Sequence, residues 1–252
     1  MNDNVVAAPL NDSGGGEIVI VTGGSSGIGL ATAHLLVSLG YMVISADLTE
    51  PPQDFKENGG SGSLLPTTID VSSETQVKEL FTQVDEFDAP LKAVINCAGI
   101  THRATLEHTS FHQWRKVLAV NLDGTFLMSR EGVIRFLKNG GGTIINLASA
   151  AAVVPVKSVP AYAASKAGVL MLSRQTALDY AESGIRVYAV CPTGVDTPLI
   201  ARRFEASQDP IAARSAYVRD NGPLLSPDSI AKTIAHLLRD DSPPPGPTAL
   251  VY

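Results

Sequence analysis

Residues 17–29 read EIVIVTGGSSGIG, and this stretch decides the fold. Its first six residues form a short apolar run rich in β-branched side chains, which is typical of a buried strand. Glycines follow at once, and apolar residues then recur at helical spacing over residues 28–39 until Gly40 ends the pattern. The stretch therefore predicts a strand, a glycine-rich turn and a helix.

The rest of the chain repeats this alternation. Apolar runs predict strands at residues 41–47, 64–70, 91–97, 143–148 and 185–191, and a last apolar run covers 248–252. Helical spacing predicts helices at 73–87, 110–138 (with a capping box at Ser110 and Gln113), 160–182 and 227–239. Strands that are apolar throughout and alternate with helices indicate a parallel sheet covered on both faces. We therefore expect one α/β domain over residues 17–252, a Rossmann-type doubly wound parallel sheet, preceded by a flexible segment at 1–16.

Residues 196–226 fall outside this alternation. They combine bulky and cationic side chains, among them Arg202, Arg203, Phe204, Tyr217 and Arg219. We interpret this region as a long substrate loop of the kind that closes over ligands, and a helical surface insertion is the alternative.

The composition excludes several classes of partner. The chain of 252 residues has a formal net charge of −6 and no run of Lys and Arg, which argues against nucleic acid. The two cysteines, Cys97 and Cys191, each lie in an apolar segment, so we expect buried thiols in a reducing compartment. Residues 1–16 lack the pattern of a signal peptide, and no run of about 18 apolar residues occurs. These features predict a cytoplasmic protein without membrane contact.

The turn from Thr22 to Gly29 predicts a dinucleotide site. Its glycines permit a tight turn and let backbone N–H groups approach a pyrophosphate at the positive end of the helix. A helix start that is merely rich in small residues is the alternative. The position of the glycines in the first strand–helix turn favours the dinucleotide.

Asp47 ends the second predicted strand, 18 residues after Gly29. A carboxylate there can accept hydrogen bonds from both hydroxyls of an adenosine ribose, and it repels a 2′-phosphate. Neither Ser26 nor Leu48 supplies a cation for that phosphate, so NAD is predicted in preference to NADP. A solvated strand end is the alternative interpretation of Asp47.

Tyr162 and Lys166 are four residues apart in a predicted helix, so their side chains share one face. This spacing alone is weak, and its support comes from motifs elsewhere in the chain. These are Asn96-Cys97-Ala98-Gly99, Asn121, Ser149 and Pro192-Thr193-Gly194. In this ordered set the sequence resembles the short-chain dehydrogenase/reductase family, from about residue 17 to residue 252.

The resemblance implies a catalytic set of Ser149, Tyr162, Lys166 and Asn121. The two hydroxyls would hold the substrate oxygen, Tyr162 would transfer the proton, and Lys166 would bind the nicotinamide ribose and lower the tyrosine pKa. Asn121 would support a water in the proton path. Electrostatics agrees with the role of the lysine, because an ammonium at about 5 Å favours the phenolate by roughly 2 pKa units.

The turn, Asp47 and the resemblance together imply a cofactor site along the carboxyl ends of the strands. Its expected residues are Gly23, Ser25, Ser26, Ile28, Gly29, Asp47, Leu48, Asp70, Val71, Asn96, Ala98, Gly99, Tyr162, Lys166, Pro192, Thr193, Gly194, Val195 and Thr197. For the contacts at the adenine, the ribose and the carboxamide, ordinary strand-end packing is the alternative. Three residues depart from the family's pattern: Cys97 and Tyr188 stand where Asn is frequent, and Thr193 where Gly is usual.

We therefore expect an NAD(H)-dependent oxidoreductase that transfers a hydride between nicotinamide and a secondary alcohol or its ketone. The resemblance also implies a homodimer or homotetramer. We expect no metal site, since the capping box leaves His108 outside the helix of His112. The alternatives are an NADP(H)-dependent ketoreductase of a biosynthetic pathway and a non-catalytic dinucleotide-binding regulatory protein. Beside the motifs, Arg103 is a candidate partner for a substrate carboxylate, with a solvated loop charge as the alternative.

Overall fold

The computed structural model describes residues 16–52, 61–205, 207–239 and 250–251. The segment expected to be flexible, 1–16, lies outside the described residues except for Gly16. The last apolar run, 248–252, is described only at its residues 250 and 251.

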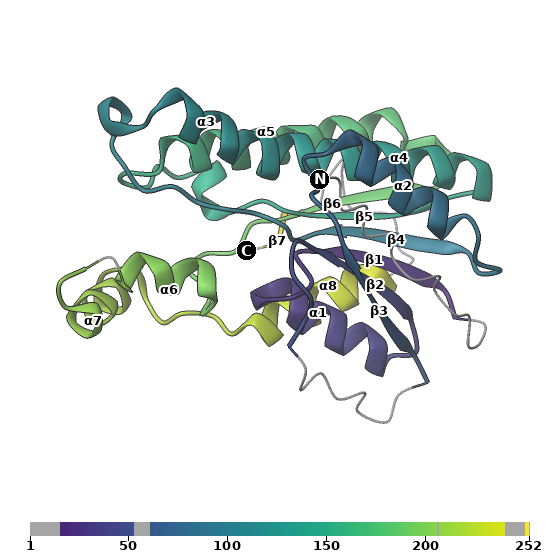
Figure 1. Cartoon of the computed structure of the whole chain (residues 1–252), viewed down its shortest axis with the longest axis horizontal. Coiled ribbons are helices and arrows are strands. Elements are labelled where there is room, and N and C mark those ends of the chain that lie inside the picture. Colours follow the sequence, from purple (N-terminus) through teal and green to yellow (C-terminus); the bar gives the residue numbers. More distant parts are fainter. Residues whose placement is uncertain (1–15, 53–60, 206, 240–249, 252) are drawn as a thin grey trace, which may run out of the picture.

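A parallel sheet forms the centre of the molecule (Figure 1). In the described part of the chain its seven strands follow the order β3-β2-β1-β4-β5-β6-β7. They are β1 (Ile18–Thr22), β2 (Met42–Asp47), β3 (Ser63–Thr68), β4 (Leu91–Asn96), β5 (Gly142–Leu147), β6 (Ile185–Val190) and β7 (Leu250–Val251). All five residues of β1 are buried, and Ile20 lies between Ile44 of β2 and Val94 of β4. The predicted doubly wound sheet is confirmed, with its switch point between β1 and β4.

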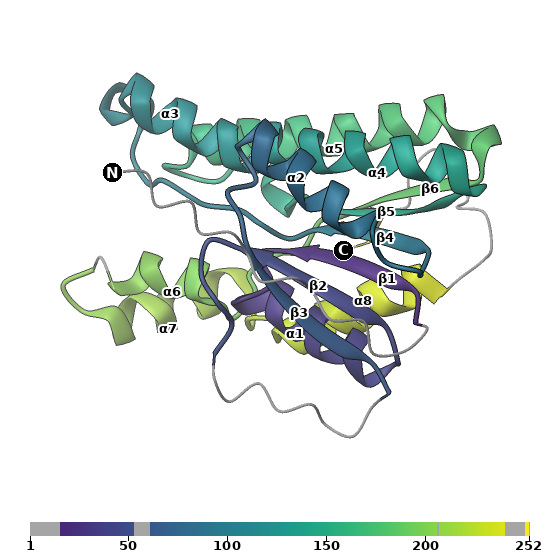
Figure 2. The ribbon, with the colours of Figure 1, turned by 45° about the vertical axis from the view of Figure 1, so that its right-hand side comes forward.

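Helices cover both faces of the sheet, as Figures 1 and 2 show. The layer on one face contains α1 (Gly27–Ser38) and α8 (Pro227–Arg239), and the layer on the other contains α2 (Glu74–Val84), α4 (Gly124–Asn139) and α5 (Pro160–Asp179). Successive side chains of a strand point to opposite faces of the sheet, so alternate residues of β1 belong to two different hydrophobic cores. Ile20 packs in the core that contains Phe81 and Met128. Val19 packs in the core that contains Leu36 and Ile234. Within the described part of the chain, no helix has both the length and the apolar character needed to cross a bilayer.

The long helix predicted from the capping box contains an irregular turn. Ser110 and Gln113 make the capping box at the start of α3 (Phe111–Leu118), as predicted. The chain then passes through a π-helical turn, Ala119–Asp123, before it continues as α4. Such turns occur mostly at functional sites, and this one contains Asn121.

The region 196–226 is helical rather than a long loop. It contains α6 (Pro198–Glu205) and α7 (Pro210–Asn221), so the alternative of a helical insertion is the correct one. A proline begins each of these helices, where its missing N–H costs no hydrogen bond. Both helices project from the end of the molecule at which α3 also lies (Figures 1 and 2).

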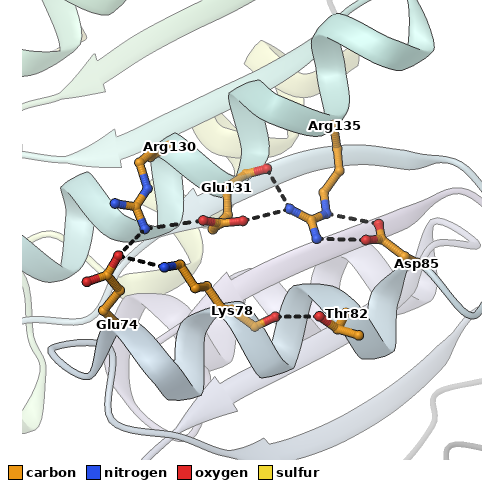
Figure 3. A network of polar contacts seen from close by, with 7 residues as sticks. All are labelled: Glu74, Lys78, Thr82, Asp85, Arg130, Glu131 and Arg135. Atoms are coloured by element: carbon orange, nitrogen blue, oxygen red, sulfur yellow. Dashed lines mark hydrogen bonds and ion pairs between the residues drawn. The ribbon is translucent and has the colours of Figure 1, made fainter.

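An ion-pair network fixes α2 against α4 (Figure 3). At its centre is Glu131, whose side chain is 8% exposed. One of its carboxylate oxygens lies 2.8 Å from Arg135 and the other 3.2 Å from Arg130. Arg135 continues to Asp85 at 2.7 Å, and Arg130 to Glu74 at 3.0 Å. A buried carboxylate thus separates two guanidinium groups that would otherwise repel each other.

The Glu131→Gln variant tests this network. Removing the buried charge leaves two cations without their shared anion, and we expect the free energy of unfolding to fall by about 1 to 3 kcal/mol. Urea unfolding followed by circular dichroism measures the change. The Glu74→Gln variant is the matched control, because Glu74 is half exposed and screened by solvent, so its effect should be much smaller. Equal losses in the two variants would contradict the central role of Glu131.

Candidate active site

The glycine-rich turn brings backbone groups together at the carboxyl end of β1. Gly23 has a φ of +66°, and a Cβ built on it would lie 2.9 Å from the backbone N of Ala98. A Cβ on Gly29 would lie 2.1 Å from the carbonyl oxygen of Gly23. No side chain caps the start of α1 at Ser26. The glycines therefore pack this turn, the pyrophosphate cradle, closely, and the uncapped start of α1 leaves helix N–H groups that can bind the phosphates of a dinucleotide.

Asp47 is bound to this turn rather than simply solvated. Its carboxylate accepts hydrogen bonds from the backbone N–H groups of Ser25 at 3.1 Å and Leu48 at 2.7 Å. The hydroxyl of Ser25 in turn donates to the carbonyl of Thr49. These contacts hold one negative charge beside the glycines, while the side chain of Leu48 is exposed and brings no cation.

Three residues predicted at the adenine or the ribose have partners inside the protein. Asp70 accepts hydrogen bonds from the backbone and the hydroxyl of Ser72, and Val71 is buried. The amide of Asn96 is 3% exposed and donates to Ser129 at 3.2 Å and Asn146 at 2.8 Å. The side chain of Asn96 thus joins the sheet to its helices. Contact of these three residues with a cofactor stays a prediction.

Ser149, Tyr162 and Lys166 meet beyond the end of β5. Ser149 follows that strand, and its side chain is hydrogen-bonded to that of Tyr162. Tyr162 and Lys166 both lie on α5. Lys166 is 5% exposed, its Nζ donates to the carbonyl of Leu147 at 2.5 Å, and it lies 5.8 Å from the centre of the Tyr162 ring. A Cβ on Gly99 would approach this Nζ to 3.6 Å. The structure therefore brings together all three groups that the sequence predicted.

Burial dominates the acid–base properties of these groups. It raises the pKa of Tyr162, while the hydrogen bond with Ser149 lowers it to a smaller extent. Burial also lowers the pKa of Lys166 to about 8 and raises that of the nearby Cys97 to about 12. The expectation that Lys166 by itself lowers the pKa of Tyr162 is therefore not met by the protein groups alone. Desolvation of the phenolate raises the pKa of Tyr162, whereas the Coulomb attraction of an ammonium acts in the opposite direction.

Asn121 is fully buried in the π-helical turn. Its side chain accepts a hydrogen bond from the backbone N–H of Ile100 at 2.8 Å and donates to the carbonyl of Ile100 at 3.0 Å. It also donates to Ser165 at 2.9 Å, and that hydroxyl reaches the carbonyl of Tyr162 at 2.7 Å. Because all these bonds are internal, Asn121 acts as a positioning residue. Its predicted contact with a water stays a prediction.

The segment after β6 lies across from the glycine turn. The carbonyl of Pro192 accepts from the N–H of Ala150 at 3.0 Å, beside Ser149. Thr193 is exposed, so its side chain leaves this contact intact. Farther along, the methyl group of Thr197 lies 3.1 Å from a Cβ built on Gly27. The predicted residues from Pro192 to Thr197 thus extend from the catalytic end to the pyrophosphate cradle, past Gly194 and the buried Val195.

Two residues of the site were missed from sequence. The hydroxyl of Thr22 accepts a hydrogen bond from the N–H of Ala98 at 3.1 Å and so joins the ends of β1 and β4. Ser165 links Asn121 to α5. Its spacing of three residues from Tyr162 places it on the same helix face, which was an available signal.

Comparisons with known proteins agree with this geometry. A family model described as short chain dehydrogenase matches residues 17–208. An NADP-dependent (R)-specific alcohol dehydrogenase of Lentilactobacillus kefiri is 35% identical over 90% of this chain and 91% of that protein. A cis-4-hydroxycyclohexanecarboxylate dehydrogenase of Sinomonas cyclohexanicum is 34% identical, over 89% and 90%. The crystal structure of levodione reductase has a TM-score of 0.86 at 28% identity, covering 93% of this chain and 95% of that one.

The burial of Lys166 makes stability depend on pH. Its pKa is about 8 in the folded protein against the ordinary lysine value of 10.5. Between these values the unfolded chain binds more protons, so the free energy of unfolding rises with pH. Relative to a Lys166→Met variant, we expect the wild type to gain roughly 2 kcal/mol between about pH 7 and pH 10, measured by urea unfolding.

A Lys78→Met variant is the control for this prediction, because Lys78 lies on the surface of α2. Its stability should follow the wild-type pH profile. If the profile of Lys166→Met also ran parallel to the wild type, the lysine would titrate at its ordinary pKa.

Proposed function

This chain belongs to the short-chain dehydrogenase/reductase family and is an oxidoreductase of CH–OH groups, and from that premise we propose that Ser149, Tyr162 and Lys166 carry its reaction. The substrate would be a secondary alcohol or its ketone. The observation that carries the proposal is the hydrogen-bonded pair of Ser149 and Tyr162 beside the buried ammonium of Lys166. The glycine turn supports a nicotinamide dinucleotide, since its glycines let the start of α1 pack closely on the ends of β1 and β4, and the start of a helix attracts a pyrophosphate.

Each of the three residues has a distinct role in alcohol oxidation. Ser149 holds the substrate oxygen by a hydrogen bond, and Tyr162 accepts the proton of that hydroxyl as the carbon–oxygen bond becomes a carbonyl. Lys166 supplies positive charge next to the phenol. A nicotinamide dinucleotide, when bound, would supply the hydride chemistry, and the positive charge of its oxidised ring would oppose the effect of burial on Tyr162. In ketone reduction the raised pKa of Tyr162 keeps the phenol protonated, so that it holds the proton that the carbonyl oxygen takes up.

We further propose that the dinucleotide is NAD(H). The support is Asp47, whose carboxylate is held beside the glycine turn by the backbone of Ser25 and Leu48, so that a 2′-phosphate would meet a fixed negative charge. The relative from L. kefiri is named as NADP-dependent, which keeps NADP(H) as the second candidate.

The exposed side chains on one layer support self-association. Phe126 and Leu137 on α4, with Met171 and Leu178 on α5, are large, apolar and exposed. We propose that they bury one another in a homodimer or homotetramer. Cys97 and Cys191 are both free thiols, which supports the expected cytoplasmic location.

The Tyr162→Phe variant tests the catalytic proposal. Loss of the proton acceptor should lower turnover of secondary alcohols by about 100- to 10,000-fold and leave dinucleotide binding intact. Nicotinamide absorbance measures turnover, and calorimetric titration with NAD⁺ measures binding. Tyr180→Phe, at the other end of α5, is the matched control and should keep full activity. A wild type that binds NAD⁺ but oxidises no alcohol of a broad panel would instead support a regulatory protein.

The Asp47→Ala variant tests the cofactor proposal. Removing the carboxylate should shift the ratio of kcat/KM for NAD⁺ and NADP⁺ toward NADP⁺ by about 10- to 100-fold, because a like-charge contact is lost. Glu50→Gln removes an exposed acid three residues farther along and should leave the ratio unchanged. A wild type that prefers NADP⁺ would refute the role given to Asp47.

A further inference from the structure

Two arginines from separate segments are close enough for their charges to interact, the exposed Arg103 and the half-buried Arg203. Arg103 lies in the segment after β4, and its guanidinium donates to the carbonyl of Lys157 at 3.3 Å. Arg203 lies on α6, with its guanidinium carbon 4.5 Å from the ring centre of Tyr217 on α7. Each guanidinium is thus held by a neighbour that leaves most of its N–H groups available.

These anchors connect directly to the catalytic residues. Lys157 lies in the short segment that joins Ser149 to Tyr162, and the N–H of Ala104 fixes the same segment through the carbonyl of Ser158 at 3.1 Å. On the other side, the hydroxyl of Tyr217 lies 2.5 Å from a Cβ built on Gly194. Gly194 follows Pro192, whose carbonyl holds the residue after Ser149. Both arginines are therefore anchored to segments that lead to the catalytic residues, Arg103 to the segment before Tyr162 and Arg203, through Tyr217, to the segment after β6.

The charges of this pair are not neutralised within the protein. Two other arginines of the insertion have carboxylate partners, since Arg214 pairs with Asp196 at 2.7 Å and Arg219 with Asp220 at 2.9 Å. Neither Arg103 nor Arg203 has an ion-pair partner in residues 16–52, 61–205, 207–239 and 250–251. The pKa of Arg103 is lowered, first by burial and then by the charge of Arg203. Two such groups favour an anion between them.

We propose that Arg103 and Arg203 bind the carboxylate of the substrate, so that the protein acts on secondary alcohols that are hydroxy acids, or on the matching keto acids. This inference rests on the proposed function. In oxidation the hydroxyl carbon gives a hydride to the dinucleotide and the hydroxyl proton goes to Tyr162, so a C=O bond forms and the carboxylate is unchanged. A planar guanidinium matches the two oxygens of a carboxylate, and a pair anchored to two segments would set the distance from carboxylate to hydroxyl.

Matched pairs of acids and esters test this inference. The probes are 3-hydroxybutyrate, 4-hydroxypentanoate and 4-hydroxycyclohexanecarboxylate, each compared with its methyl ester in the full chain with NAD⁺ and with NADP⁺. The wild type should prefer at least one acid over its ester. Arg103→Gln and Arg203→Gln should each raise the KM of that acid by about 10- to 100-fold and leave kcat/KM of the ester unchanged. Arg→Lys at either position should restore part of the loss.

Arg202→Gln is the matched control, because Arg202 is the exposed neighbour of Arg203 on the same helix and should change neither substrate. Equal use of acid and ester, equal loss of both in the variants, or turnover of uncharged alcohols alone would overturn the inference while the proposed function stands. If no alcohol is turned over, the proposed function fails. Calorimetric titration with cyclohexanecarboxylate then decides: binding lost in the double Gln variant supports the inference, and equal or absent binding overturns it.

Discussion

The buried carboxamide of Asn121 holds three parts of the chain in one arrangement. It bonds both backbone groups of Ile100, in the segment after β4, and it reaches Ser165 on α5, while its own backbone adopts a π-helical turn. The amide is fully buried, so no water replaces a hydrogen bond that it loses. Each lost bond then costs the full desolvation penalty of the polar group. The bonds therefore fix how far α5 lies from the end of β4. That distance sets the space between Gly99 and Lys166, and with it the place of the ammonium beside the phenol.

Burial at this point reverses the usual order of two titrating groups. A free phenol is slightly more acidic than a free ammonium, but here the pKa of Tyr162 is raised and that of Lys166 is lowered to about 8. The same desolvation acts in opposite directions because it disfavours phenolate and ammonium alike. Near neutral pH the protein groups thus keep a neutral phenol beside a charged lysine. Such a pair is ready to donate a proton, and it accepts one only when further positive charge lies close to the phenol.

The strands followed from the sequence because their signals are local, whereas the catalytic triad followed from the resemblance that the ordered motifs carry. β1 is buried on both faces, so its apolar run marked it, and Tyr162 and Lys166 share a helix face by spacing alone. The helices α6 and α7 were not separable from a loop, because their prolines and arginines carry no strong helical pattern. The internal bonds of Asn121 and Asn96 depend on residues far along the chain, as does the contact of Arg203 with Tyr217. The direction of the pKa shift of Tyr162 required its burial, which a Coulomb estimate for one pair leaves out.

The insertion that contains α6 and α7 is attached so that it can differ without disturbing the chemistry. Two backbone bonds close its base, from Asp196 N–H to the carbonyl of Leu225 and from Leu225 N–H to the carbonyl of Gly194, both at 2.8 Å. Because these bonds use no side chains, residues between 197 and 224 can change while Gly194 and Pro192 stay beside Ser149. A fold of this kind does not identify the alcohol. The identity of the substrate therefore depends on the side chains that the insertion and the segment after β4 contribute, among them Arg203 and Arg103 in this chain.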